Sequence, residues 1–213
     1  PDGARYEGEF LDGQEHGYGI YEWAEGDRYE GNYVSGEKRG YGEYFYANGD
    51  IAKGNYENGQ LNGPGEYLHN EIEGCESHCE IKIVGMFKNG QITGQGIGFT
   101  ETGKISYQGE YRKGLWHGRG IAYDEKGFPF YAGEISDGEL TGIGKQFFYD
   151  GSYYEGGFKN GIWHGNGVQF SNEFNETFVG KYDDGSLQGP GTIITKDYRI
   201  EANFKDGLLH GQG

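Results

Sequence analysis

Large, charged and small residues alternate in a short segment that recurs along the whole chain. In its first copy, Tyr6-Glu7-Gly8-Glu9-Phe10, aromatic residues stand at both ends and glycine stands in the middle. This period of two predicts a β-strand with two different faces. Copies begin at residues 6, 29, 52, 83, 107, 131, 154, 178 and 200. Such regular self-similarity predicts a stacked repeat array.

Turn signals follow each copy of this segment. Asp12-Gly13 is typical of a tight hairpin turn, and a second strand is predicted from Gly17 through Trp23, with Gly26 leading into the next copy. We therefore predict an all-β fold, an elongated single-layer antiparallel sheet of about nine stacked hairpins that forms one repeat domain over residues 1–213. The longer spacing between residues 52 and 83 predicts an insertion at residues 70–80.

Residues that return at every equivalent position are interpreted as structural. The glycine at the centre of each first strand is expected to let aromatic rings lie against the backbone. His16, His117, His164 and His210 each precede the glycine of a Gly-x-Gly segment, and packing or turn hydrogen bonding explains their recurrence better than catalysis. Trp116 and Trp163 share one position near the hairpin edge and are interpreted as packing residues.

The copies differ along the predicted second strand. The third residue after each Gly-x-Gly is apolar in seven of eight copies, which predicts that this register faces a continuous core: Glu22, Phe45, Leu68, Phe99, Tyr123, Phe147, Phe170 and Ile194. The flanking positions then face the other side, where the first copies carry an aromatic stripe: Tyr21, Trp23, Tyr44, Tyr46 and Tyr67. Such a stripe is typical of a binding surface, and the alternatives are an unseen cap, self-association or plain packing.

The acidic residues Glu22 and Glu43 are predicted to border this stripe and to favour a basic, apolar partner such as an amphipathic helix. The insertion holds Cys75 and Cys79 with His69 and His78 nearby, a weak candidate metal site that competes with a local disulfide and with free thiols.

Charge narrows the classes of partner. The chain has 18 basic and 34 acidic residues and a net charge of −16. Because this charge repels phosphate groups, it excludes nucleic acid as a partner and disfavours binding to anionic lipid. Two cysteines favour a reducing, cytoplasmic setting. No catalytic constellation stands out, so neither catalysis nor a cofactor is expected. Because the chain begins at Pro1 and not at a methionine, we expect a fragment of a longer protein.

The pattern Tyr-Glu-Gly-x-Phe/Tyr-x-x-Gly-x-x-x-Gly-x-Gly resembles the MORN (membrane occupation and recognition nexus) repeat over residues 3–213. The copy from Tyr154 to Gly167 is among the closest and the copy at Ala52 among the loosest. The resemblance implies grooved rods that act mainly as protein-binding scaffolds at cytoskeletal or membrane-adjacent sites, several of them as dimers.

We therefore expect a non-catalytic scaffold that binds a partner segment through an aromatic, acidic-rimmed groove in its N-terminal repeats. A homodimer is also compatible with the sequence. Two alternatives remain open, a phospholipid-contacting module at a membrane junction and a regulatory repeat arm of a lipid kinase or SET-type methyltransferase. The expected location is cytoplasmic, with cytoskeletal or membrane association through partners.

Overall fold

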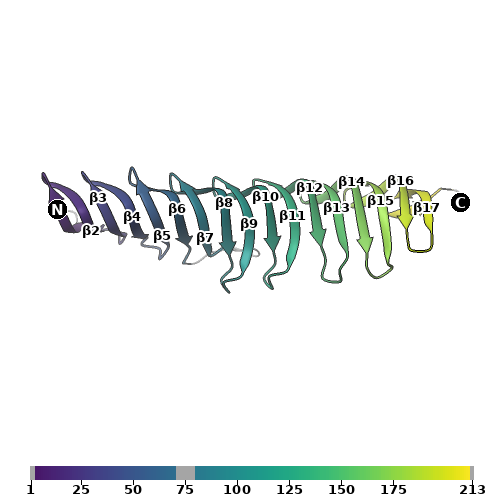
Figure 1. Cartoon of the computed structure of the whole chain (residues 1–213), viewed down its shortest axis with the longest axis horizontal. Coiled ribbons are helices and arrows are strands. Elements are labelled where there is room, and N and C mark those ends of the chain that lie inside the picture. Colours follow the sequence, from purple (N-terminus) through teal and green to yellow (C-terminus); the bar gives the residue numbers. More distant parts are fainter. Residues whose placement is uncertain (1–2, 71–79, 212–213) are drawn as a thin grey trace. The chain divides into compact units, whose positions relative to one another are not determined.

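The computed structural model describes residues 3–70 and 80–211, and these residues form eighteen β-strands (Figure 1). The strands run antiparallel to their neighbours in sequence, which confirms the predicted all-β fold of stacked hairpins. The chain separates into two compact units, Pro1–Leu115 and Trp116–Gly213. Each unit is described by itself below, and a single repeat domain over residues 1–213 stays a prediction.

The strands of the first unit are β1 (Arg5–Leu11), β2 (Gln14–Glu22), β3 (Arg28–Val34), β4 (Glu37–Phe45), β5 (Ile51–Glu57), β6 (Gln60–Leu68), β7 (Lys82–Lys88), β8 (Gln91–Phe99) and β9 (Ile105–Arg112). Those of the second unit are β10 (Leu115–Tyr123, whose first residue is the last of the first unit), β11 (Pro129–Ser136), β12 (Glu139–Phe147), β13 (Tyr153–Lys159), β14 (Ile162–Ser171), β15 (Glu176–Asp183), β16 (Ser186–Ile194), β17 (Arg199–Lys205) and β18 (Leu208–His210).

Tight turns join the two strands of each hairpin. At Asn58 and Gly59 the φ angles are 51° and 76°, so both central residues are left-handed, as a type I′ turn requires. Aspartate, asparagine and glycine tolerate this conformation best. The turn predicted at Asp12-Gly13 has the same geometry and is confirmed.

Glycine pairs lie beneath buried tyrosine rings, as the sequence predicted. Gly31 of β3 faces Gly42 of β4, and the ring of the fully buried Tyr29 covers both. A Cβ atom at Gly42 would overlap the Tyr29 hydroxyl group and ring. The glycine pairs therefore make the room in which the tyrosines of the first strands are buried.

The predicted assignment of faces is wrong. Tyr29 pairs with Tyr44 across neighbouring strands, so both side chains lie on the buried face. Phe45 pairs with Arg28 on the opposite face and is only half-buried. The register of Phe45 is therefore not the core, and the predicted aromatic stripe shares a face with the buried tyrosines. The tyrosine register is buried because its rings pack onto the glycine backbone of the same sheet. Burial of the phenylalanine register would instead require a second layer of structure over that face.

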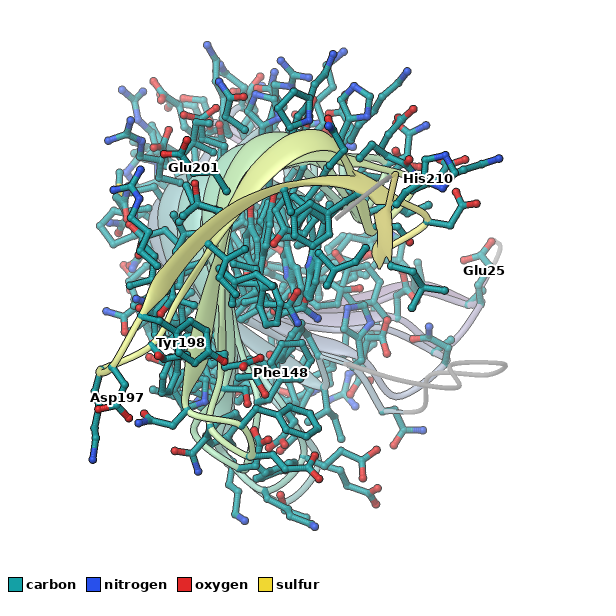
Figure 2. The ribbon with its side chains drawn as sticks, turned by 90° about the vertical axis from the view of Figure 1, so that its right-hand side faces the viewer. Glu25, Phe148, Asp197, Tyr198, Glu201 and His210 are labelled. Carbon is teal, nitrogen blue, oxygen red and sulfur yellow. The ribbon has the colours of Figure 1, made fainter. Side chains whose placement is uncertain are left out.

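We call the face with the buried tyrosines the inner face and the opposite one the outer face. Figure 2 shows a curved strand β17 with Glu201 on its outer side. On the outer face, cations lie over the half-buried phenylalanines. The Arg28 guanidinium carbon is 5.5 Å from the centre of the Phe45 ring, and the Lys82 Nζ atom is 5.9 Å from that of Phe99. This cation–π cover explains how these rings stay half-buried although the described residues form one sheet with no second layer over it.

Candidate functional site

Six rings form a continuous row along the inner face of the first unit, which we call the ring row: Tyr21, Trp23, Tyr44, Tyr46, Tyr67 and His69. The rings come from the next-to-last residue of each of β2, β4 and β6 and from the first residue after each strand. Successive ring centres are 4.5, 5.4, 4.5, 5.9 and 4.7 Å apart. The row thus brings together all five aromatic residues predicted from the sequence.

The ring row is neither sealed nor freely exposed. Its inner edge packs against the tyrosines of the first strands, with 6.4 Å between the ring centres of Tyr44 and the buried Tyr29 and 6.3 Å between those of Tyr21 and the half-buried Tyr6. Tyr46 remains 36% exposed, and the other members are partly exposed. The row therefore offers one edge of each ring to a partner while the other edge is held by the fold.

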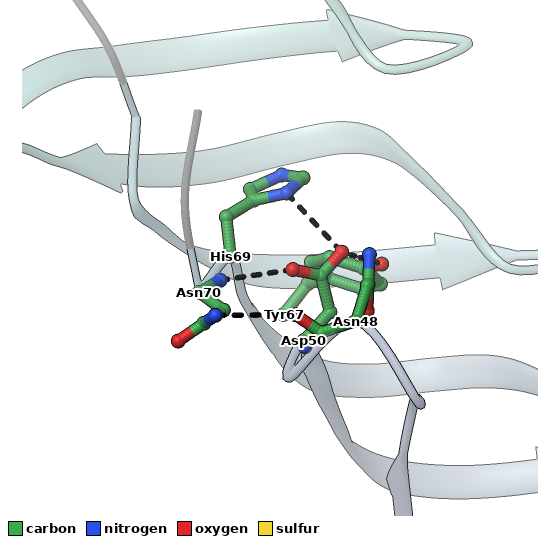
Figure 3. A network of polar contacts seen from close by, with 5 residues as sticks. All are labelled: Asn48, Asp50, Tyr67, His69 and Asn70. Carbon is green, nitrogen blue, oxygen red and sulfur yellow. Dashed lines mark hydrogen bonds and ion pairs between the residues drawn. The ribbon is translucent and has the colours of Figure 1, made fainter. Parts of the chain in front are cut away.

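A polar network at the turn before β5 fixes one end of the row (Figure 3). The Tyr67 hydroxyl and the Asn70 backbone N–H each donate a hydrogen bond of 2.9 Å to the Asp50 carboxylate. His69 Nδ1 lies 3.6 Å from Asp50 Oδ2, and Asn48 accepts the backbone N–H of Asp50. Asp50 is buried, so these bonds replace the water that its carboxylate loses.

The network sets the charge states of Asp50 and Tyr67. Burial by itself would raise the pKa of Asp50, but the hydrogen bonds from Asn70 and Tyr67 lower it below its ordinary value. Burial and the bond to Asp50 raise the pKa of the Tyr67 hydroxyl. At neutral pH the aspartate is therefore ionised and the tyrosine is a neutral donor, which keeps the ring of Tyr67 in place.

Asp27 has the same role one repeat earlier. Its carboxylate accepts a hydrogen bond of 2.5 Å from the hydroxyl group of Tyr44 and one of 2.8 Å from the backbone N–H of Ala47. Burial, followed by the hydrogen bond to Asp27, raises the pKa of Tyr44. Two rings of the row are thus locked by carboxylates from the turns that precede β3 and β5.

Lys38 extends among the rings, a feature that the sequence analysis missed. Its Nζ atom lies 4.3 Å from the centre of the Tyr44 ring and 5.2 Å from that of Trp23. Burial lowers its pKa to about 8, although Asp27 acts in the opposite direction. Other repeats place Leu61, Ile92 and Trp163 at this position. The signal in the sequence was a lysine in a register that is otherwise mostly apolar.

The predicted acidic border lies on the other side of the sheet. Glu43 forms an ion pair of 2.8 Å with Lys53, and Glu22 lies 3.6 Å from Arg28. Both glutamates stand next to inner-face residues in their strands, and adjacent strand residues point to opposite faces. Glu22 and Glu43 therefore belong to the outer face, and the carboxylates that touch the ring row are those of Asp27 and Asp50.

The candidate metal site is only partly visible. His69 is a member of the ring row and lies beside Asp50, whereas Cys75, His78 and Cys79 fall outside the described residues. Within residues 3–70 and 80–211, no group of three potential ligands is close enough to hold a metal ion. Metal binding by the insertion stays a prediction.

The repeated histidines and Trp163 have structural contacts in the second unit. His117 accepts the backbone N–H of Asp137 at 3.4 Å, which agrees with the predicted turn-bonding role. The Trp163 ring stacks on Tyr154 with 4.3 Å between centres and an angle of 7° between planes. Its Nε1–H donates a 2.7 Å hydrogen bond to Gln146, so the predicted packing role of Trp163 is confirmed.

A family model for the MORN repeat matches eight segments of the chain, at residues 6–28, 29–51, 53–70, 84–97, 107–127, 131–153, 154–172 and 201–213. The predicted copy at residue 178 has no matching segment. No curated protein matches the chain. In the part of the chain that the structure describes, no helix has the length and apolar character needed to cross a membrane. The match indicates a repeat scaffold or a membrane-associated module, of a kind that is generally non-catalytic.

Proposed function

This chain belongs to the MORN repeat family, and on that premise we propose that it is a non-catalytic scaffold that binds a partner protein along the ring row of its first unit. The single observation that carries the proposal is the row itself, an unbroken series of partly exposed rings with centres 4.5 to 5.9 Å apart. Contiguous exposed aromatic surface of this kind is a common anchor for protein partners.

Preorganisation supports this use of the row. The Asp27 and Asp50 carboxylates hold the hydroxyl groups of Tyr44 and Tyr67, and neighbouring rings hold one another. A partner that binds such a surface does not have to order it, so little conformational entropy is lost on the scaffold side. Rigid aromatic anchors are the residues that contribute most to binding in protein interfaces.

Charge defines the chemistry of the partner. The chain has a net charge of −16, and two carboxylates touch the row directly. A segment with apolar side chains along one face and lysine or arginine beside them complements this surface, and an amphipathic helix presents that set. The same acidity opposes binding to anionic phospholipid, so membrane or cytoskeletal association is proposed to come through partners in the cytoplasm.

The test uses a fluorescein-labelled 18-residue peptide of leucine and lysine patterned as an amphipathic helix, measured by fluorescence anisotropy. We expect the variant with Tyr21→Ser, Trp23→Ser, Tyr44→Ser and Tyr46→Ser to bind at least about tenfold more weakly, because the anchors are removed. The single variant Tyr46→Ser changes only a partly exposed residue and should therefore stay folded. Its affinity for the peptide should fall by a smaller factor.

The matched control removes two tyrosines from the outer face of the same repeats. Tyr18 and Tyr41 are 54% and 57% exposed, and Tyr18→Ser with Tyr41→Ser should leave peptide binding unchanged. Undiminished binding by the folded ring-row variant would refute the proposal. Sedimentation with phosphatidylserine vesicles at physiological salt is the second arm, and strong pelleting there would favour a membrane module instead.

A further inference from the structure

The inner face of the second unit is hollowed at a place where the first unit carries aromatic rings. A hollow of about 320 Å³ is lined by Trp163, Gln169, Ser171, Phe174, Phe178 and Leu187, among others. This volume lies at the lower end of the range for small-molecule sites, which suits one large side chain and not a whole ligand of drug size. Its walls combine aromatic and aliphatic side chains with polar groups in nearly equal measure, and the polar groups include the amide of Gln169 and the hydroxyls of Ser171 and Ser186.

The repeat pattern shows what this space accommodates. Gln169 pairs with Tyr154 and Phe178 in the same register in which Tyr44 pairs with Tyr29 and Ala52. Ser171 occupies the position of Tyr46, two residues further along. Shorter side chains thus stand at both positions that carry tyrosine rings in the second repeat. The hollow lies beside these two shorter side chains, while Phe178 in its wall stands at the position of the smaller Ala52. We infer that the space that remains admits one flat aromatic ring.

One wall of the hollow is held rigidly. The Trp163 ring is stacked on Tyr154, and its Nε1–H is bonded to Gln146. Phe148 contacts the same ring edge to face, with 6.2 Å between centres. In Figure 2, Phe148 lies on the inner side of the curved strands. The indole is therefore fixed before any partner arrives, as expected of an interface anchor.

A second hollow, of about 200 Å³, shares the Trp163 side chain with the first. Its lining includes Asp183 and Asp184, together with His164 and Lys159. The Asp183 carboxylate lies 3.1 Å from His164 Nδ1. Because Asp183 already lies against His164, the Asp184 carboxylate and the face of the indole are the groups that attract a cationic side chain of a partner, by charge and by cation–π contact.

We propose that the two hollows form a binding site for a partner peptide segment that places an aromatic ring in the first hollow and a lysine or arginine side chain in the second. Trp163 separates the two subsites and contacts both groups. The occupant is a protein segment, because the chain's net charge of −16 opposes the phosphate groups of anionic lipid. This site lies within the second unit and does not depend on the ring row of the first unit.

The test is an NMR titration that follows the indole N–H signal of Trp163, assigned with the variant Trp163→Phe. The probe is acetyl-Phe-Gly-Arg-amide, and two matched peptides replace either its arginine by glutamate or its phenylalanine by alanine. We expect a saturable shift with a Kd of about 1 mM for the probe and at least about tenfold weaker binding of the two controls.

Two variants locate the site. Ser171→Tyr places in the second unit the residue that Tyr46 provides in the second repeat, so it should block the aromatic subsite and abolish the shift without harming the fold. Asparagine tolerates the left-handed backbone at position 184, where φ is 45°, so Asp184→Asn should keep the turn. Because it removes a negative charge, it should weaken binding of the arginine probe several-fold.

Three results would overturn the proposal: no saturable shift of Trp163 up to about 20 mM probe, equal affinity for all three peptides, or binding that persists in Ser171→Tyr. Each concerns the second unit only. Failure of the ring-row experiment would leave this site standing, and failure here would leave the ring row standing.

Discussion

The inner faces of the two units are built on one repeat pattern but present different surfaces. In the second repeat, Tyr44 and Tyr46 continue a row of rings with 4.5 Å between their centres. In the seventh repeat, Gln169 and Ser171 stand at the same positions and leave a hollow of about 320 Å³. The glycine pairs and buried tyrosines are common to both, so binding specificity resides in a few variable positions while the framework stays constant.

A third variable position shows the same contrast. Lys38 in the second repeat and Trp163 in the seventh occupy equivalent places beside the buried tyrosines. Lys38 extends its amine among four rings, whereas Trp163 stacks flat on Tyr154. An ammonium group buried among rings loses hydration that a tryptophan does not need, so the first unit accepts a local destabilisation that the second avoids.

The largest expected effect tests whether the framework is really common to both units. Tyr29→Ala and Tyr154→Ala each remove a fully buried ring from above a glycine pair, and each should lower the free energy of unfolding by about 3 kcal/mol or more. Urea denaturation measures both losses. A loss below about 1 kcal/mol in one variant only would show that the two units do not share this framework.

The second prediction converts one surface into the other. Tyr44→Gln with Tyr46→Ser introduces the residues of the seventh repeat into the second, and we expect a loss of about 2 kcal/mol, because two partly buried rings and the bond to Asp27 disappear. The reverse exchange, Gln169→Tyr with Ser171→Tyr, should be neutral or stabilising in the same urea experiment. Destabilisation by both exchanges would mean that the hollow is not equivalent to the space of the two rings.

The third prediction concerns the turns that link hairpins. Asp50→Asn should lower the free energy of unfolding by about 1.5 kcal/mol, because charge-assisted bonds from Tyr67 and Asn70 weaken. Ser152 accepts the N–H of Asn172 at 3.0 Å in the equivalent turn of the second unit, and Ser152→Ala should have a smaller effect.

The pH dependence of Asp50→Asn provides a control. The folded-state pKa of Asp50 is lowered, so its stabilising contribution is present above the ordinary aspartate pKa and is lost as the pH falls through the folded value. The difference between the original protein and Asp50→Asn should therefore shrink in acid, below about pH 4. A difference that stays constant down to pH 2 would contradict the ionised network.

The smallest effect is expected at Lys38. Lys38→Leu should raise the free energy of unfolding at pH 7 by about 1 kcal/mol, because solvent partly screens the half-buried amine and limits the gain. The lowered folded-state pKa of about 8 means that the unfolded chain holds the proton more tightly. Stability of the original protein should thus rise between pH 8 and the ordinary lysine pKa, and the advantage of leucine should narrow over that window. An advantage independent of pH would contradict the buried ammonium group.

Local patterns in the sequence were sufficient for the strands and turns. The period of two over Tyr6–Phe10 predicted the strand observed at Arg5–Leu11, and the Asp12-Gly13 signal predicted the hairpin turn. Both features depend on residues close together in the chain, on side-chain alternation and on left-handed φ angles that few residues tolerate. The members of the ring row were found for a similar reason, since their positions repeat in register.

The face of the sheet could not be chosen from the sequence, because both registers are apolar in this chain. Tyr44 and Phe45 are adjacent and equally hydrophobic in pattern, and only the packing of Tyr29 onto the paired glycines decides which of them joins the buried side. Because the tyrosine register is the buried one, Glu22 and Glu43 lie on the outer face, opposite the ring row, where they pair with Arg28 and Lys53.

The sequence by itself determined the repeat, the strands, the turns and which residues vary between copies, because these depend on local backbone preferences and on period. Only the tertiary structure decided what the variable residues do. The amine of Lys38 among four rings and the hollow beside Trp163 depend on residues in neighbouring hairpins about 20 positions apart. Burial arises from such cross-strand neighbours, and no single copy of the repeat contains them.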